Sequence, residues 1–373
     1  MKILVIGSGP VGSSICNNLL KNKKNNIYLS ESSDEYIKYH KPFSSLIPLY
    51  RIGYGGLGNY WHRVCDLSNT SINGYRNELH NNILCDFGIN KKVIAEAKNL
   101  NNSEFIPLLP KSIQNFNLKK RNSITHLNAV SEIKHQNSLW NVKFIDNKQH
   151  SFDKVFLCAG IHGDSDILIN SGLARPTNFL SDHIIINVDE KILKSNNFIK
   201  TKHFSKGFLR KFEIIDNMKV SYRASYKGNK SSIIYSDNAY NIFKSLVKLN
   251  SYNSYLEAFN LRYGTPIHTN YVKRFIQIPV NNIYIIDNNN NISLNSEVHQ
   301  EIISNTNNYL GHHNFIIESG IHYWGKVNLN EDVKYLEKNG LFICGSAHWN
   351  SAPETHFTFQ NILKGLHFSN SFI

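Results

Sequence analysis

Short apolar runs and glycine turns divide the first part of the chain into a strand, a helix and a second strand. The apolar segment 2–6 leads into a glycine-rich turn, 7–12, which is followed by the helical segment 13–20. A second apolar segment, 27–31, ends in an acidic residue. A run of consecutive apolar residues that stops at small residues is typical of a buried parallel strand. The pattern therefore predicts a β-α-β unit.

The same kind of pattern returns further along the chain. Residues 123–133 alternate between apolar and polar, and with residues 140–144 they predict two strands of a small antiparallel excursion. Residues 154–160 predict a buried parallel strand that continues the first sheet. Near the C-terminus, residues 340–346 predict another strand, and residues 357–367 predict a helix whose N-terminus faces the end of that strand.

Between residues 165 and 320 the pattern changes to successive strands separated by turn residues. Strands are expected over 182–191, 206–215, 218–227, 231–236, 270–279 and 282–287, and helices over 239–248 and 255–261. Successive strands with short connections predict an antiparallel sheet. The fold class is therefore α/β: a Rossmann-like domain with a parallel sheet and β-α-β units, residues 1–165 and 320–373, and an inserted α+β substrate domain with an antiparallel sheet, residues 166–319.

Composition narrows this picture only slightly. A chain of 373 residues has room for about two domains. The net charge of +13 suggests nucleic acid, but the basic residues are scattered and form no stripe with stacking aromatics, so we expect no nucleic-acid partner. The five cysteines are odd in number and form no CxxC pair, which favours a reducing compartment and no metal site.

No apolar run approaches the roughly 18 residues of a transmembrane helix, and the first run is too short for a signal peptide. We therefore expect a cytoplasmic protein that acts on a small molecule. The sequence is also compatible with a homo-oligomer.

The glycine turn matches the GxGxxG pattern of dinucleotide-binding β-α-β units. In such a unit Gly7 permits the tight turn, Gly9 lets a diphosphate approach the backbone, and Gly12 lets the helix pack close to the strand. Unpaired N–H groups at the helix start then face an anion. Glu31 can accept hydrogen bonds from ribose hydroxyls, and its charge repels a 2′-phosphate. FAD or NAD is thus favoured over NADP, and the alternative is a glycine turn that binds nothing.

A second glycine-rich stretch follows at residues 53–58, with four glycines in six residues. Because glycine loses so much backbone entropy on ordering, such a cluster needs a cause, and close passage against a large flat ligand is one. A plain loop is the alternative. Ala159-Gly160, after the predicted parallel strand, would also let the backbone lie beside the same dinucleotide.

The order of these segments carries a family resemblance. The sequence contains GSGPVG, GGLGNYW, VFLCAGIHGDSDILINSGL followed by NFLSDHI, then HYWGKV and GLFICGSAHWNSAPETHFTFQNILKGL. In this combination it resembles the glucose-methanol-choline (GMC) family of FAD-dependent oxidoreductases, and the GG-x-G-x-x-W form resembles the pyranose oxidase branch. The resemblance runs from residue 1 to about residue 368 and covers the FAD-binding domain.

The resemblance implies FAD as the cofactor. Some members of the pyranose oxidase branch tether the flavin through a histidine where this chain has Asn59-Tyr60, so non-covalent binding is expected. The residues implied to contact FAD are Gly7, Gly9, Pro10, Val11, Gly12, Glu31, Ser32, Gly55, Gly56, Leu57, Gly58, Asn59, Trp61, Val130, Ala159, Gly160, Gly345, Ser346, Phe357 and Thr358.

The resemblance also implies two catalytic residues, His322 and His356, as a base and its partner. Oxidation of an alcohol requires removal of the hydroxyl proton, and imidazole titrates near neutrality. His348 and Lys326, which replaces the family's usual threonine, are candidate substrate contacts. His62 is a further candidate near the flavin or the substrate, whereas His162, His183, His312 and His313 are expected to be packing or surface residues.

Together these features favour an FAD-dependent oxidoreductase that oxidises a CH–OH group of a polar, sugar-like substrate by hydride transfer to the flavin. A flavin-dependent isomerase or mutase on a nucleotide sugar is an alternative, distinguished by turnover that consumes no electron acceptor. A non-catalytic flavin-binding protein is another, but binding alone would need neither histidine of the pair.

Overall fold

The structure is a computed structural model. It describes residues 1–32, 36–38, 50–60, 65–67, 93, 95, 103–107, 122–191, 201–204, 207–211, 213–215, 218–225, 271–287, 291–311, 314–320, 322–349 and 357–373. The strand expected over 231–236 and the helices expected over 239–248 and 255–261 lie outside these residues.

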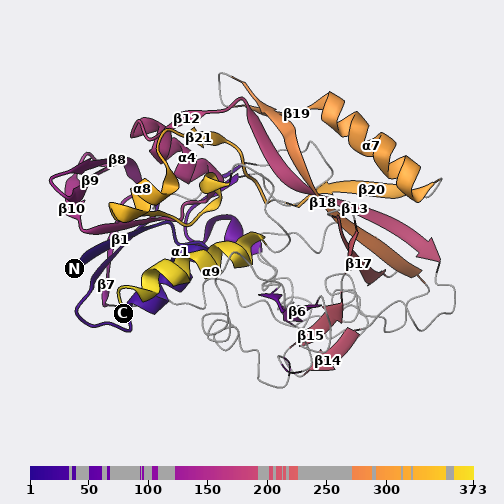
Figure 1. Cartoon of the computed structure of the whole chain (residues 1–373), viewed down its shortest axis with the longest axis horizontal. Coiled ribbons are helices and arrows are strands. Elements are labelled where there is room, and N and C mark those ends of the chain that lie inside the picture. Colours follow the sequence, from indigo (N-terminus) through magenta and orange to yellow (C-terminus); the bar gives the residue numbers. More distant parts are fainter. Residues whose placement is uncertain are drawn as a thin grey trace.

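A five-stranded parallel sheet forms the centre of the part of the fold that contains both chain termini (Figure 1). Its strands, in spatial order, are β22 (Leu341–Ile343), β11 (Lys154–Leu157), β1 (Lys2–Ile6), β2 (Asn26–Ser30) and β7 (Ile124–Leu127). Helix α1 (Pro10–Leu19) connects β1 to β2, which confirms the predicted β-α-β unit. The helix begins three residues earlier than expected, because a proline is well suited to the first helical position.

The strands of this sheet are buried on both faces. In β1, Leu4 and Ile6 belong to one hydrophobic cluster, whereas Ile3 and Val5 belong to another. Successive side chains of a strand point to opposite faces, so each apolar run supplies both clusters. Helices α1 and α9 (Phe357–Asn370) pack together and cover one face (Figure 1).

The two helices that cover the sheet are tied by polar contacts as well as by packing. The Asn18 amide nitrogen donates to the Ser369 hydroxyl and to the Asn370 side-chain oxygen, each over 2.8 Å. Residues from the two ends of the chain therefore share one layer of the core.

Strands β8 (Val130–Gln136), β9 (Leu139–Phe144) and β10 (Gln149–Phe152) form a small antiparallel sheet, as expected. The prediction for 123–133 was wrong in one respect. Residues 124–127 are strand β7, which pairs in parallel with β2, and only the residues from Val130 onward join the antiparallel sheet. An alternating pattern shows which face a residue occupies but not the direction of its partner strand.

The inserted segment contains a larger antiparallel sheet, as predicted. Its order is β16 (Glu213–Ile215), β17 (Met218–Ser225), β18 (Tyr271–Ile286), β13 (Phe179–Lys191) and β20 (Phe315–Ser319), and β19 (Ile292–Leu294) also pairs with β18. Helix α7 (Ser296–Leu310) lies against it. One hydrophobic cluster runs from Leu4 and Leu157 of the parallel sheet to Ile184 and Ile276 of this one, so the two sheets share a core.

The strands expected over 270–279 and 282–287 are one continuous strand, β18. Residues 281–283 stand opposite the single residue Ser181 of β13, where the register shifts. Asn282 adopts a φ of 55° there and its N–H donates to the Ser181 hydroxyl over 2.9 Å. The turn-like residues therefore mark a bulge and not a chain reversal.

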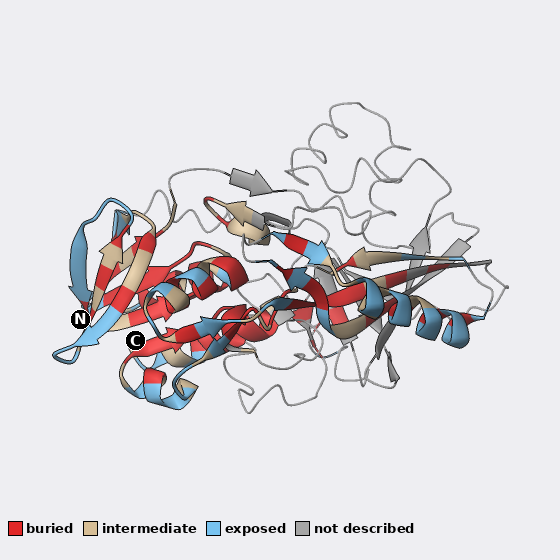
Figure 2. Ribbon diagram, turned by 90° about the horizontal axis from the view of Figure 1, so that it is seen from above, coloured by how far each residue is buried: buried red, intermediate tan, exposed pale blue. Residues whose placement is uncertain are grey.

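Further elements complete the description. Two two-stranded sheets consist of β3 (Tyr36–Lys38) with β4 (Tyr50–Ile52) and of β12 (Ala174–Pro176) with β21 (Val327–Leu329). A four-stranded sheet has the order β14 (Thr201–Phe204), β15 (Gly207–Lys211), β6 (Ser103–Pro107) and β5 (Cys65–Asp66). The other elements are α4 (Gly160–Asn170), α8 (Val333–Lys338) and the 3₁₀ turns η1 (Gly56–Tyr60) and η4 (Ser346–His348). Buried residues concentrate in the parallel sheet and its helices, and α7 exposes its outer face (Figure 2). Across the described ranges, no helix is long and apolar enough to cross a membrane.

The packing of α9 on the sheet gives a test of the fold. Phe359 is fully buried between them, so Phe359→Ala is expected to lower the free energy of unfolding by about 3–5 kcal/mol. Urea denaturation followed by circular dichroism measures the change. Tyr335→Ala, at a side chain that is 55% exposed on α8, is the matched control and should change stability by about 0.5 kcal/mol or less. Equal losses in both variants would contradict this packing.

Candidate functional site

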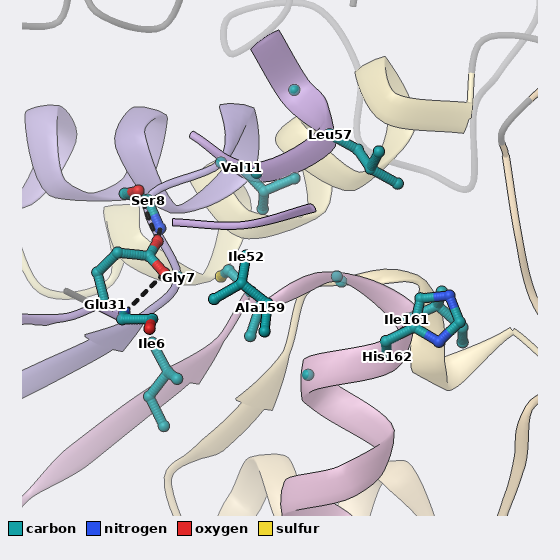
Figure 3. A pocket seen from close by; sticks show the side chains of 18 of the residues that line it. Ile6, Gly7, Ser8, Val11, Glu31, Ile52, Leu57, Ala159, Ile161 and His162 are labelled. Carbon is teal, nitrogen blue, oxygen red and sulfur yellow. Dashed lines mark hydrogen bonds between the residues drawn. The ribbon is translucent and has the colours of Figure 1, made fainter. Parts of the chain in front are cut away.

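A cavity of about 450 Å³ lies at the carboxyl ends of β1, β2, β11 and β22 (Figure 3). In an open parallel sheet, ligands bind in the crevice beyond the carboxyl ends of the strands. The sequence-predicted residues that line the cavity are Gly7, Gly9, Pro10, Val11, Glu31, Ser32, Gly55, Gly56, Leu57, Gly58, Val130, Ala159, Gly160, His322, Gly345, Ser346 and Thr358.

The remaining sequence-predicted residues lie elsewhere or are not described in full. Gly12 packs behind the glycine turn. Lys326 is buried, and its ammonium group pairs at 3.0 Å with Asp166, a residue that does line the cavity. Asn59, His348 and Phe357 are described by backbone only, and Trp61, His62 and His356 lie outside the described residues.

The three glycines of the first turn meet three different constraints. Gly7 has a φ of 97°, and a Cβ there would overlap the backbone at Cys158 and Ala159. A Cβ at Gly12 would overlap the Gly7 carbonyl oxygen. At Gly9 a Cβ would meet no protein atom closer than 3.9 Å. The protein itself therefore requires glycine at the first and last of these positions, whereas at Gly9 the room opens onto the cavity.

The start of α1 is suited to an anion. Gly9 is its N-cap residue and offers no side-chain hydrogen bond, Pro10 occupies the first turn, and that turn contains no acidic residue. The backbone N–H groups of the first turn are thus left for another acceptor, and the helix dipole adds partial positive charge. Both Gly9 and Pro10 line the cavity.

Glu31 lies at the end of β2 and is held by the glycine turn. Its Oε2 accepts from the Ser8 N–H at 2.8 Å and from the Ser8 hydroxyl at 2.6 Å, and its Oε1 accepts from the Ser32 N–H at 2.9 Å (Figure 3). A carboxylate has about four acceptor positions, so capacity remains on Oε1 for a ligand hydroxyl. The carboxylate is oriented before any ligand arrives.

Ser8 also connects the two glycine motifs. The Gly55 N–H donates to the Ser8 hydroxyl over 2.7 Å. Gly53, Gly55 and Gly56 have φ values of 104°, 85° and 49°, a region that side chains other than glycine rarely adopt. The second glycine loop is therefore bent back onto the first, and both contribute backbone to one wall of the cavity.

A buried carboxyl group supports the opposite wall. The Ala159 N–H donates to Asp164 Oδ1 over 2.6 Å, and a Cβ at Gly345 would overlap Asp164 Oδ2. Burial raises the pKa of Asp164 well above its ordinary value, more than the Ala159 hydrogen bond lowers it. The nearby Cys158 thiol also has a pKa raised mainly by burial and then by Cys344, so it remains protonated and is a poor nucleophile.

Histidine and tyrosine side chains gather at the other end of the cavity from Glu31. His322, half-buried, and Tyr323 line that end together with His162 of α4. The rings of His162 and Tyr323 are 6.2 Å apart, and those of His322 and His183 are 5.6 Å apart. Figure 3 shows Glu31 on one side of the cavity and His162 on the other. His162, which was expected to be a packing or surface residue, therefore lines the cavity, whereas His183 is a buried residue beside His322 and is not part of the cavity lining.

Several cavity residues were not found from the sequence. The polar ones are Ser8, Ser30, Arg51, His162, Asp166, Asn170, Tyr323 and Asn361. All of them lie inside or directly beside a recognised motif: for example, Ser8 is inside GxGxxG, His162 follows Ala159-Gly160, and Tyr323 is inside HYWGKV. Proximity to a motif is the signal that could have identified them. Within the described part of the chain, no group of three or more histidine, cysteine, aspartate or glutamate side chains could hold a metal ion.

Comparison with known proteins gives structural similarity without sequence similarity. No protein-family model matches the sequence, and a search of curated proteins finds no match. Pyridoxine 4-oxidase from Mesorbium loti is similar at 10% identity with a TM-score of 0.53, over 100% of this chain and 99% of that chain. A formate oxidase variant from Aspergillus oryzae is similar at 10% identity with a TM-score of 0.50, over 99% of this chain and 97% of that chain. At such identities the similarity establishes the fold alone.

The contact between Gly12 and Gly7 gives a test of the turn. Gly12→Ala is expected to lower the free energy of unfolding by about 3 kcal/mol, near the upper end of overpacking costs, because the new Cβ meets backbone that cannot rotate away. Chemical denaturation measures the loss. Gly9→Ala is the matched control and, when both proteins are compared free of bound ligand, should retain the stability of the unmodified protein within about 1 kcal/mol. Equal destabilisation by both variants would contradict the assigned roles.

Proposed function

We propose that this protein is an FAD-dependent oxidoreductase of the GMC type, which oxidises a CH–OH group of a polar, sugar-like substrate. The observation that carries the proposal is a single cavity with a dinucleotide-type turn and an acid at one end and His322 at the other. The pyridoxine oxidase and the formate oxidase of similar fold are oxidases by name, and the name of the second structure includes FAD. All the segments that resemble GMC sequences, except NFLSDHI, supply residues to the same cavity.

The cavity residues fit each part of FAD. Glu31, with acceptor capacity on Oε1, would take a hydroxyl of the adenosine ribose. The backbone beside Gly9, the start of α1 and Arg51, a residue that also lines the cavity, would hold the diphosphate. The room at Gly9 is the space that a closely approaching diphosphate needs. These contacts are all non-covalent.

The isoalloxazine ring would then extend toward His322. Bound FAD supplies the two-electron acceptor that takes hydride from the substrate C–H bond. His322 would accept the hydroxyl proton, a task suited to a group that titrates near neutrality. His356 would be its partner and His348 a further substrate contact, whereas Lys326, whose ammonium group pairs with the cavity-lining Asp166, would act on the substrate through that carboxylate. His162 adds a polar group at this end, and Thr358 and Asn361 also line the cavity, which favours a polar substrate.

The first test is cofactor binding. The purified protein is expected to be yellow, to show a flavin spectrum and to release FAD on denaturation. Gly9→Ala should fold with unmodified stability but bind FAD about 10–100-fold more weakly, because the new methyl group occupies the diphosphate space. Fluorescence titration of the apoprotein with FAD measures the affinity. A stable, folded protein that rejects FAD would end the proposal.

The second test is substrate-driven bleaching of the flavin. A panel of alcohols and sugars identifies a reductant by anaerobic stopped-flow spectroscopy. His322→Ala should retain FAD and its spectrum but reduce the flavin about 10²–10⁴-fold more slowly, the usual contribution of a general base. His299→Ala, at a half-buried position of α7 that does not line the cavity, serves as a control with unmodified kinetics. Unchanged reduction by the His322 variant would remove it from the mechanism.

A further inference from the structure

A buried carboxylate lies directly behind the end of the cavity that His322 lines. Asp182 of β13 is fully buried. Its Oδ2 accepts from the Ser319 hydroxyl over 2.5 Å and lies 3.4 Å from the Tyr284 hydroxyl, and its Oδ1 accepts from the His322 backbone N–H over 2.8 Å. The carboxylate thus joins three elements of the inserted sheet to the segment that carries His322.

The surroundings of Asp182 are organised around its charge. Burial, followed by the negative charge of Asp182, raises the pKa of Tyr284 well above its ordinary value, and the same two causes act on Tyr323. Both phenols therefore stay protonated and act as donors near neutral pH. The Tyr323 hydroxyl lies 3.4 Å from the Ser319 hydroxyl, so the hydrogen-bonded group reaches a residue that lines the cavity.

Stability alone is a poor explanation for a carboxylate in this position. Removing a carboxylate from water costs several kcal/mol, and a buried ionic group is often no more stabilising than an apolar residue of similar volume. Hydrogen bonds from Ser319 and from the His322 N–H favour the ionised form. A group of this kind beside a candidate general base is better explained by its effect on that base.

We propose that Asp182 is the positioning residue of His322: it fixes the His322 backbone, and its buried negative charge stabilises the imidazolium that forms when His322 accepts the substrate proton. This inference rests on the proposed function. The substrate O–H bond breaks and its proton goes to the His322 ring, while the hydride of the C–H bond goes to the bound flavin. Asp182 stays ionised throughout and takes no proton.

Other titratable groups near His322 also affect how readily its ring accepts a proton. From β13, the His183 ring lies 5.6 Å away, and its protonation would disfavour a second imidazolium. The His162 ring of α4 lies 6.2 Å from the ring of Tyr323, the neighbour of His322 in the chain. Tyr284 of β18 carries no charge near pH 7, because its pKa is raised. Asp182 is accordingly the group among these that favours a proton on His322.

The test is a histidine NMR titration of the protein as purified with its FAD, labelled on imidazole carbon and nitrogen. The chain has 17 histidines, and the signal that disappears in His322→Gln assigns His322. In the unmodified protein we expect His322 to titrate above about 6.5, the ordinary histidine value. In Asp182→Asn, which keeps an oxygen for the His322 N–H but removes the charge, we expect titration about one pH unit lower.

Ser319→Ala is the matched control, because it removes a donor to the same carboxylate and leaves the charge in place. It should move the His322 titration by less than half as much as Asp182→Asn. An equal shift in both variants, or none in Asp182→Asn, would overturn the proposal. If Asp182→Asn fails to fold, the unmodified protein decides: titration of His322 below about 6.5 overturns the inference.

Kinetics separates this inference from the proposed function. With a reductant in hand, Asp182→Asn should move the acidic limb of the pH–rate profile of flavin reduction about one unit lower and reduce the plateau rate about tenfold. A merely structural role would lower the rate without moving the limb. If no substrate reduces the flavin, the proposed function fails, and the NMR titration still tests the effect of Asp182 on His322.

Discussion

The close approach of α1 to β1 is the constraint on which the rest of the site depends. No Cβ fits at Gly12 because the Gly7 carbonyl oxygen occupies its place, so the helix begins directly at the end of the strand. This geometry brings the unpaired N–H groups of the first helical turn to the cavity and places Ser8 between Glu31 and Gly55. A looser turn would move the helix start, Glu31 and the second glycine loop apart.

The features that could be predicted from sequence are those encoded within one segment. The β-α-β unit, the parallel strand ending at Ala159-Gly160 and the antiparallel sheet of the insertion each have a local period or a local turn. The errors came where long-range pairing decides the outcome. Strand β7 joins the parallel sheet because β2 is its neighbour, and β18 continues through a bulge because Ser181 of a distant strand accommodates it.

The same distinction holds within the site. The glycine positions and Glu31 belong to a compact pattern and were recognisable, whereas Asp164 and Asp182 stand inside segments that carry the family resemblance but received no role of their own. Their roles depend on burial and on partners such as Ala159 and His322, which only the folded chain supplies. His162 is a similar case, since only the arrangement of α4 turns it toward the cavity.

The layer formed by α1 and α9 has a consequence for how the protein comes to exist. Asn18 bonds to Ser369 and Asn370, and β22 completes the edge of the parallel sheet beside β11. During synthesis the N-terminal β-α-β unit therefore waits, with one apolar face uncovered, until residues beyond 340 have left the ribosome. Contacts between residues so far apart in the sequence form slowly, and the apolar surface that they will cover stays exposed until they form. Assembly of the cavity is thus a late event, and until it occurs the uncovered apolar face favours aggregation of the new chain.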